Sequence, residues 1–429
     1  MKKNNLALSG LLVLPLLAHA EAQAIDSSSS REHQNQEISM AGAPIAFSSG
    51  DWGTAVGASG IVTGLLQPQM SIFGTAIYSN NDSWLGFIGV SNVMFPGQRQ
   101  WLFDFYALEG NYRETNYFVS GNPGYAHEQP GSNDSSADNC IRTHGREANY
   151  WARFRYILPI GEGKNGAMAS LMHREGETND AGRLWNPLES GITSLELHPF
   201  FRRRDLGDMN PDYEDSEAMG VRFVVDYDNR DSSRLPTRGS HLTFTYNNDW
   251  GSSDRPSWAT WEAEYSKFID LGTNQYMRQK VLALNAWLSD TPTWNDTETV
   301  SGEQQYRRPP SFAGARLGGW DKMRGFETNR FYGRSAVAYS AELRMMPDWQ
   351  PLQELPLVGE LYEIPWWQWA IFVDVGRVAD TLSLSELHTD MKYSVGGSIR
   401  FQVEGVTVRT EIAGSEEDTM FRVFINQPF

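Results

Sequence analysis

One arginine stands out because of the residues around it. The stretch WDKMRGFETNRFYG, from Trp320 to Gly333, places Arg324 directly before Gly325 and Phe326, and it ends on a second aromatic–glycine pair. Ordering a glycine costs more backbone entropy than ordering any other residue, and phenylalanine prefers burial, so both are costly in a solvated loop. A guanidinium binds carboxylates in a planar fork. The pattern therefore predicts an ordered arginine that faces acidic partners.

Few other residues have a spacing that suggests chemistry. The eight histidines are scattered without paired-ligand spacing, and Cys140 is the only cysteine, so neither a disulfide nor a thiolate metal site is expected. The acidic stretch Asp205–Glu217 has part of the EF-hand spacing, but Tyr213 stands where that loop needs glycine and Met219 where it needs glutamate. We interpret it as a surface loop. We expect no metal, no cofactor and no catalytic site.

The N-terminus predicts export. Lys2 and Lys3 precede an apolar run from Leu6 to Leu17, and Ala18-His19-Ala20 fits a small-residue cleavage site. Such a segment is typical of a signal peptide and is too short for a spanning helix. We predict a signal peptide over residues 1–20. Residues 21–51 are polar in large part, and we expect a disordered periplasmic segment there.

Composition leaves two classes of protein open. Apolar residues make up 40% of the chain, aromatic residues reach 12%, and no apolar run after the N-terminus approaches the ~20 residues of a spanning helix. A soluble secreted enzyme fits these values, and so does a transmembrane β-barrel with aromatic girdles. The net charge of −17 gives no basic surface for nucleic acid, which we exclude as a partner.

Alternating segments predict an all-β fold. From Gly53 onward, period-2 segments are separated by glycine, asparagine, aspartate, serine and proline. Their number, sixteen, is even, as in bacterial outer-membrane barrels. The expected strands are 54–65, 70–80, 83–94, 100–114, 147–158, 166–174, 190–203, 218–229, 239–249, 258–270, 276–289, 334–346, 366–378, 391–403, 405–414 and 419–428. We therefore predict a 16-stranded antiparallel transmembrane β-barrel over residues 52–429.

The two faces of the expected strands differ in polarity. Ile371 and Val373 share one face of their strand and Asp374 lies on the other, while Glu342 and Arg344 share the polar face of the preceding strand. Alternation alone is compatible with a soluble sandwich, in which the charges lie in water. In a barrel, the apolar face contacts lipid and the charges line a lumen. The N-terminus, the strand number and the C-terminus favour the barrel.

The C-terminus predicts an insertion signal. Phe421, Val423, Ile425 and Phe429 are spaced by multiples of two and would share one apolar face of a last strand. A terminal aromatic on such a strand is typical of outer-membrane barrels, although a soluble sandwich can also end on such a strand. We predict that these residues are recognised by the β-barrel assembly machinery. Outer-membrane lipid and lipopolysaccharide are then the expected surroundings.

Several motifs together resemble one superfamily. They are DYDNRDSSRLPTRGSHLTFTY at Asp226–Tyr246, GGWDKMRGF around Arg324, AYSAELR at Ala338–Arg344, FVDVGRV at Phe372–Val378, and the terminal FINQPF. In order and spacing they are similar to the outer-membrane assembly and secretion barrels, also called bacterial surface antigens. This superfamily includes the central barrel of the β-barrel assembly machinery and the two-partner secretion transporters. The resemblance is strong over 218–429.

The resemblance implies an anchored loop inside the barrel. In the superfamily a long extracellular loop, here about 290–333, folds back into the lumen, and its arginine meets carboxylates on the next two strands. The matching residues are Arg324, Gly325, Phe326, Glu342 and Asp374, and the period-2 pattern independently places both carboxylates inward. The alternative is a solvated loop tip, with the two carboxylates paired to other lumenal arginines.

The resemblance also implies a function. Protein insertion, translocation or outer-membrane assembly is expected, without enzymatic activity. Superfamily members usually carry periplasmic POTRA domains before the barrel, and residues 21–51 are too few for one. We therefore expect a barrel without POTRA domains that works with a separate periplasmic partner of that type. The alternative is a passive pore or structural surface barrel.

Overall fold

A single all-β architecture accounts for most of the chain. The computed structural model describes residues 38–49, 52–168, 171, 185–206, 216–233, 235–354, 364–403, 406–425 and 427–429. The expected signal peptide, 1–20, lies outside these residues, as does 207–215 within the acidic stretch. No helix among the described residues is long and apolar enough to cross a bilayer.

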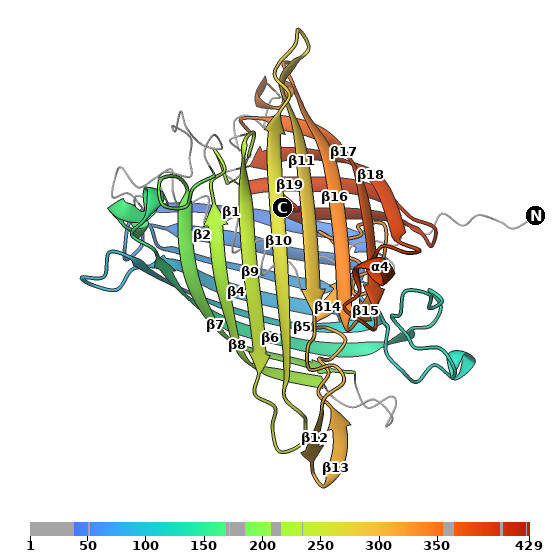
Figure 1. The fold of residues 1–429 in the computed structure, drawn as a ribbon. Helices are drawn as coiled ribbons and strands as arrows, with labels where there is room; N and C mark the ends of the chain where they lie inside the picture. Colours follow the sequence, from blue (N-terminus) through green and yellow to red (C-terminus); the bar gives the residue numbers. More distant parts are fainter. Residues whose placement is uncertain are drawn as a thin grey trace, which may run out of the picture.

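Sixteen antiparallel strands form the barrel wall, each paired with its neighbours in chain order (Figure 1). They are β1 (Ser39–Ser49), β2 (Gly53–Thr63), β3 (Ser71–Ser79), β4 (Trp84–Val93), β5 (Trp101–Tyr117), β6 (Ile141–Ile157), β7 (Ile192–Asp205), β8 (Ser216–Asp228), β9 (Gly239–Asp249), β10 (Trp258–Asp270), β11 (Met277–Asp290), β16 (Ser335–Pro347), β17 (Trp367–Ala379), β18 (Lys392–Val403), β19 (Val406–Gly414) and β20 (Thr419–Ile425). The prediction of a 16-stranded antiparallel barrel is therefore confirmed.

The remaining elements are short. Two hairpins, β12–β13 (Thr297–Val300 and Glu303–Tyr306) and β14–β15 (Ala315–Leu317 and Phe331–Gly333), form separate two-stranded sheets in the connection between β11 and β16. Single helical turns occur at η1 (Pro123–Tyr125), η2 (Gly161–Asn165), η3 (Pro351–Glu354) and α4 (Leu384–Leu387).

Two of the expected segments were wrong. One strand was missed and one was predicted in excess, so the total of sixteen strands is unchanged. The segment 21–51, expected to be disordered, contains β1, which pairs with β2 from Ser39↔Thr63 to Ser49↔Gly53. Its sequence, SMAGAPIAFSS, carries the glycine and proline of a loop, but proline has no N–H and so leaves no unsatisfied donor at Pro44. Conversely, the described residues of 166–174 are not in a strand: Ala167 and Leu171, in the β6–β7 connection, are helical and pack in one cluster with Leu102.

Side chains alternate between the outside and the lumen. On β16 and β17, Tyr339, Ile371 and Val373 point outward and are exposed, whereas Glu342 and Asp374 point inward and are buried. The same outward exposure of large apolar side chains recurs around the wall. Further examples are Val56, Tyr78, Ile88, Phe105, Leu195, Leu197, Phe223, Val225, Leu242, Phe244, Tyr265, Leu284, Val395, Ile399 and Ile412. This apolar belt is the surface that a lipid bilayer covers.

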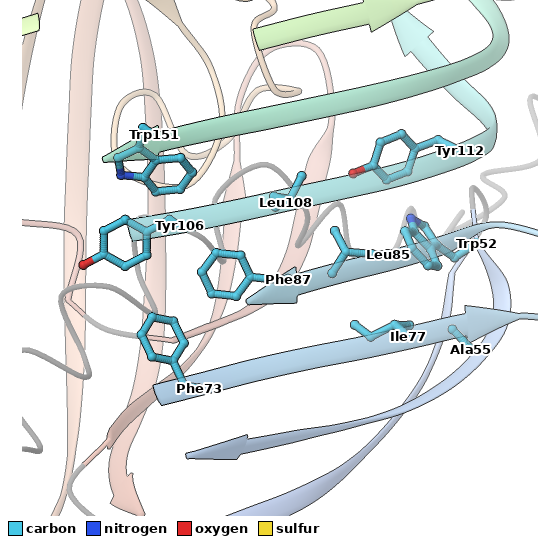
Figure 2. Close-up of a cluster of buried hydrophobic side chains, with 10 residues drawn as sticks. All are labelled: Trp52, Ala55, Phe73, Ile77, Leu85, Phe87, Tyr106, Leu108, Tyr112 and Trp151. Atoms are coloured by element: carbon cyan, nitrogen blue, oxygen red, sulfur yellow. The ribbon is translucent and has the colours of Figure 1, made fainter. Parts of the chain in front are cut away.

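Part of the lumen is apolar. Figure 2 shows ten buried side chains gathered on β2–β6 and the residue before β2; they are Trp52, Ala55, Phe73, Ile77, Leu85, Phe87, Tyr106, Leu108, Tyr112 and Trp151. Tyr106 and Trp151 stack with ring centroids 4.8 Å apart. Ile45 of β1 and Val423 of β20, the first and last strands of the sheet, both pack against this cluster.

The long connection between β11 and β16, residues 291–334, is hereafter the long loop. Because the strands alternate in direction, it shares one rim of the barrel with the connections 118–140, 250–257, 380–391 and 415–418; this is the loop rim. Hairpin β12–β13 projects beyond that rim, whereas β14 and β15 lie beside the wall strands (Figure 1). The long loop thus has an outer part and a part that enters the barrel.

A candidate loop lock in the lumen

The inner part of the long loop is held first by apolar packing. Met323, Phe326 and Phe331 are fully buried, or nearly so, in one cluster with Trp287 of β11 and Val378 of β17. Phe326 and Phe331 meet edge to face, with ring centroids 5.1 Å apart. Phe326, which the resemblance placed in the anchored part of the loop, thus lies inside the lumen.

Arg324 meets the two carboxylates expected for it. Its Nε donates to Asp374 Oδ2 at 2.9 Å and its Nη2 to Asp374 Oδ1 at 2.6 Å, which is the bidentate geometry of a guanidinium on a carboxylate. Its Nη1 donates to Glu342 Oε1. Nη2 also donates to Ser340 Oγ at 3.0 Å, and the guanidinium carbon lies 3.5 Å from the centre of the Phe372 ring. Every guanidinium nitrogen is engaged.

The ion pairs of Arg324 are buried, which increases their effect on stability. Arg324 and Glu342 have no exposed surface and Asp374 is 1% exposed. A charge removed from water needs partners of opposite sign and saturated hydrogen bonds to offset its desolvation. Burial alone would lower the pKa of Arg324, but Asp374 and Glu342 raise it above its ordinary value. The guanidinium is therefore charged at every physiological pH.

Glu342 is shared among three arginines. Besides Arg324, it accepts from Arg344 Nε at 2.8 Å and from Arg400 Nη2 at 2.8 Å. The alternative of a solvated loop tip is therefore wrong, since Arg324 is buried, although Glu342 does pair with wall arginines as that alternative expected. Asp374 differs, because Arg324 is its one cation within ion-pair distance among the described residues.

Gly325 lies too close to the wall for any side chain. A Cβ added there would stand 2.6 Å from the Cβ of Ser394 and 2.8 Å from the carbonyl oxygen of Gly414. The carbonyl of Gly325 in turn accepts a hydrogen bond of 2.8 Å from Ser415 Oγ. Close approach of the loop to β18 and β19 explains why glycine follows the arginine.

Three further arginines hold the loop, and the sequence analysis missed all of them. Arg409 of β19 donates from Nη2 to the carbonyl of Trp320 at 2.8 Å. Arg422 of β20 donates to the carbonyls of Gly319, Arg324 and Phe326. Arg330 is fully buried, and its Nη2 donates to Glu417 Oε1 at 2.7 Å.

Arg330 and Arg422 each left a signal in the sequence. Arg330 precedes Phe331-Tyr332-Gly333, which repeats the arginine, aromatic and glycine composition around Arg324. Its Nη1 also donates to Ser135 Oγ at 2.8 Å, so it ties the long loop to the 118–140 connection. Arg422 lies on the inward face given by the alternation of the last strand.

The C-terminus departs from the expected continuous face. Phe421 is exposed on the outside and Val423 is partly buried, but β20 ends at Ile425 and Phe429 does not continue the outward row. The Phe429 ring packs instead on inward-facing Phe268, at 6.4 Å between centroids. The side chain of Ile425 lies outside the described residues.

Polar contacts explain the inward turn of the last residues. The Phe429 carbonyl accepts from Arg344 Nη2 at 3.4 Å, and Gln427 accepts from Arg400 Nη1. These are the same two arginines that contact Glu342, so the chain end and the long loop meet one polar network. A single outward apolar face ending at residue 429 is therefore wrong. Recognition of the C-terminal residues as an insertion signal stays a prediction.

Comparisons with known proteins give a consistent result. Residues 147–403 match the Omp85 superfamily domain, and a search of curated proteins gave no match. Among solved structures, CdiB from Escherichia coli is similar with a TM-score of 0.53 and 11% identity, covering 90% of this chain and 61% of that one. CdiB from Acinetobacter baumannii has a TM-score of 0.49 at 11% identity, covering 91% and 59%. The chain thus spans about three fifths of these structures, and the first likeness concerns the fold.

Proposed function

Because the chain belongs to the Omp85 superfamily of outer-membrane barrels, we propose that it inserts, translocates or assembles other proteins in that membrane. The observation that supports this is the lumenal plug. The long loop enters the barrel and is held by hydrogen bonds, ion pairs and apolar packing, all of which are reversible. A reversible plug suits a barrel that must stay closed until a client arrives.

Glu342 and Asp374 have different parts in the proposed opening. When the long loop withdraws, Glu342 keeps Arg344 and Arg400 as partners, so its charge stays compensated. Asp374 loses its cation and must be hydrated instead. The cost of leaving Asp374 without Arg324 favours the closed state, and entry of water or of a client reduces that cost. Re-forming the ion pair between Asp374 and Arg324 therefore favours the return of the loop to the lumen.

The proposal includes partners. The apolar belt contacts membrane lipid and lipopolysaccharide, and the β-barrel assembly machinery inserts the chain into the membrane. A separate periplasmic protein with POTRA-type modules supplies client recruitment. The superfamily is not an enzymatic one in general, and we assign no catalytic activity to this chain.

A passive pore is the competing function. A permanently open pore needs a free lumen, whereas residues of the long loop occupy the lumen here and are buried against the four wall strands β16–β19. The plug therefore favours a gated barrel. A structural surface barrel would share the plug but would have no clients.

Depletion of the protein, followed by quantitative proteomics of the outer membrane, tests the proposal. We expect a defined set of outer-membrane or surface proteins to fall while their transcripts stay constant. Complementation by the wild-type chain should restore them, and complementation by a chain with Arg324→Ala should do so incompletely. An unchanged outer-membrane proteome after full depletion would leave only the structural barrel.

A further inference from the structure

A second polar site lies across the lumen from the ion pairs of Arg324 with Glu342 and Asp374. A cavity of about 250 Å³ separates the long loop from the wall formed by β6–β11. Its charged lining is unbalanced in sign. The lining includes the cations Arg202, Arg204, Arg222, Arg316 and Lys322, and the carboxylates of Glu262 and Asp321. For a chain of net charge −17, this is a local excess of positive charge.

Two of the five cations are neutralised by acidic neighbours. Lys322 Nζ lies 2.7 Å from Asp321 Oδ2, and Arg204 Nε lies 2.6 Å from Glu147 Oε1. Glu262, the remaining carboxylate of the lining, accepts from Asn247 and Trp287 and offsets only one charge, so the other three arginines leave a positive excess.

Arg202, Arg222 and Arg316 donate to neutral acceptors among the described residues. Arg202 Nη1 and Arg316 Nη1 both donate to the carbonyl oxygen of Phe312, at 2.9 and 2.6 Å, so two guanidinium groups converge on one oxygen. Arg222 Nε donates to Asn247 Oδ1 at 2.7 Å. Among the described residues, none of the three has a carboxylate within ion-pair distance. All three line the same cavity and are partly exposed to it.

Like charges held together in an enclosed space repel one another and attract a counterion. Arg316 lies on β14, outside the membrane-spanning strands, and shows the effect. Burial lowers its pKa, Glu262 and Asp321 offset this in part, and Arg222 and Arg204 lower the pKa further. An anion in the cavity would remove that repulsion. Guanidinium groups match the oxygens of phosphate and carboxylate in geometry as well as in charge.

We propose that this cavity binds a small oxyanion of the phosphate class between Arg202, Arg222 and Arg316. Arg316 belongs to the long loop, whereas Arg202 and Arg222 belong to the wall strands β7 and β8. The anion therefore bridges loop and wall on the side opposite Arg324. Bound anion stabilises the plugged barrel, since it binds more weakly once Arg316 has withdrawn.

Binding can be measured directly with inorganic phosphate. Trp151, Trp258, Trp287 and Trp320 line the cavity, so tryptophan fluorescence of the folded full-length chain in detergent can report occupancy. Phosphate is titrated at constant ionic strength against chloride, with calorimetry as a second readout. We expect a saturable phosphate signal that chloride does not give. Equal effects of the two anions would mean charge screening alone and would overturn the site.

Variants locate the site. Arg316→Gln and Arg222→Gln should each weaken phosphate binding by at least about tenfold, because a charge-assisted hydrogen bond is lost. Arg307→Gln is the matched control: Arg307 lies in the same loop, pairs with Asp296 and Glu298 outside the cavity, and should bind as wild type does. Heat-modifiable gel mobility checks folding, and Arg222→Lys, which keeps the charge, should lose less than Arg222→Gln. Wild-type affinity in both glutamine variants would refute the assignment.

The test does not depend on the proposed transport function. A chain that binds phosphate but has no clients would refute the transport proposal and leave the anion site intact. If the chain has clients but shows no saturable phosphate binding, the anion site is refuted and the transport proposal is unaffected.

Discussion

At the residue scale, Arg324 can be removed without touching the strand ladder. Arg324→Ala leaves Asp374 buried without a cation, and breaking a buried ion pair typically costs about 3–5 kcal/mol, which lumenal water reduces. The cost should appear as loop release, because the wall hydrogen bonds do not involve the loop. We expect unchanged heat-modifiable mobility, new cleavage within 291–334 by external protease on whole cells, and higher single-channel conductance.

Companion variants make this prediction specific. Arg324→Lys should rescue only partly, since an ammonium lacks the planar fork. Asp374→Asn and Glu342→Gln should show the same phenotype more weakly, because a neutral amide does not need a cation. Arg307→Ala, in the exposed part of the same loop, should match wild type. If Arg324→Ala also matches wild type in protease resistance and conductance, this arginine does not hold the loop.

Gly325→Ala should release the same loop by a steric route. The added methyl group would overlap Ser394 and the backbone of Gly414, so the loop must move away from β18 and β19. Gly86→Ala on β4 is the control, since a Cβ there meets no atom within 4 Å. Protease cleavage should rise in the first variant only. Equal protection in both would show that the loop adapts without leaving the lumen.

At the element scale, β1 should be indispensable. Removing residues 39–49 leaves the ladder edge of β2 without its partner inside a bilayer, where unsatisfied peptide groups cost several kcal/mol each. We expect loss of the heat-modifiable form. Removal of 297–306, which takes away hairpin β12–β13 outside the 16-stranded sheet, should preserve it. A folded barrel after the first deletion would mean that β1 is dispensable, as a disordered segment would be.

The last residues combine two roles that substitutions can separate. Phe429→Ala removes the predicted recognition aromatic and also the ring between Phe268 and Arg344. Phe268→Ala removes only the lumenal contact. If recognition dominates, Phe429→Ala should lower the outer-membrane level of the protein more than Phe268→Ala does, as measured by immunoblot of membrane fractions. Similar losses would assign the effect to packing, and wild-type levels in both would count against either role.

The strands could be predicted from the sequence wherever apolar and polar residues alternate strongly. The errors have physical causes. The segment after Ser39 has small residues and a proline, so its pairing depends on the neighbouring β2, which local pattern cannot show. Ala167 and Leu171 are apolar because they cover a barrel end, not because they face lipid. The turn of Phe429 follows from contacts with Arg344 and Phe268, which are distant in the chain.

The candidate site also has a part that the alternation of residues predicts and a part that depends on distant contacts. The acidic partners of Arg324 were predictable because Glu342 and Asp374 lie on strands whose inward faces the alternation identifies. The positions of Arg330 and Arg422 left a signal in the sequence, but their partners did not, since these are carbonyl groups and loop residues. Backbone acceptors leave no trace in residue types.

At the scale of the whole molecule, the apolar belt should determine membrane stability. Val373 lies in the middle of β17 and points outward. Val373→Arg should cost about 2–4 kcal/mol, the value for arginine on the lipid face at the bilayer midplane. Leu384→Arg is the control, because Leu384 lies in α4 at the loop rim and is already 70% exposed. Urea unfolding in lipid vesicles measures both, and equal stability would argue against burial of the belt in lipid.

The position of Phe429 bears on how the protein can be labelled. An affinity tag added at the C-terminus would start beside Arg344 and Phe268, inside the wall, and would compete with Gln427 for its contact with Arg400. The turn at Ser301 and Gly302 between β12 and β13 is exposed, and a Cβ added at Gly302 meets no atom within 4 Å. An epitope inserted there should be reachable by antibodies at the cell surface, while purification handles fused to the chain end should reduce the yield of folded protein.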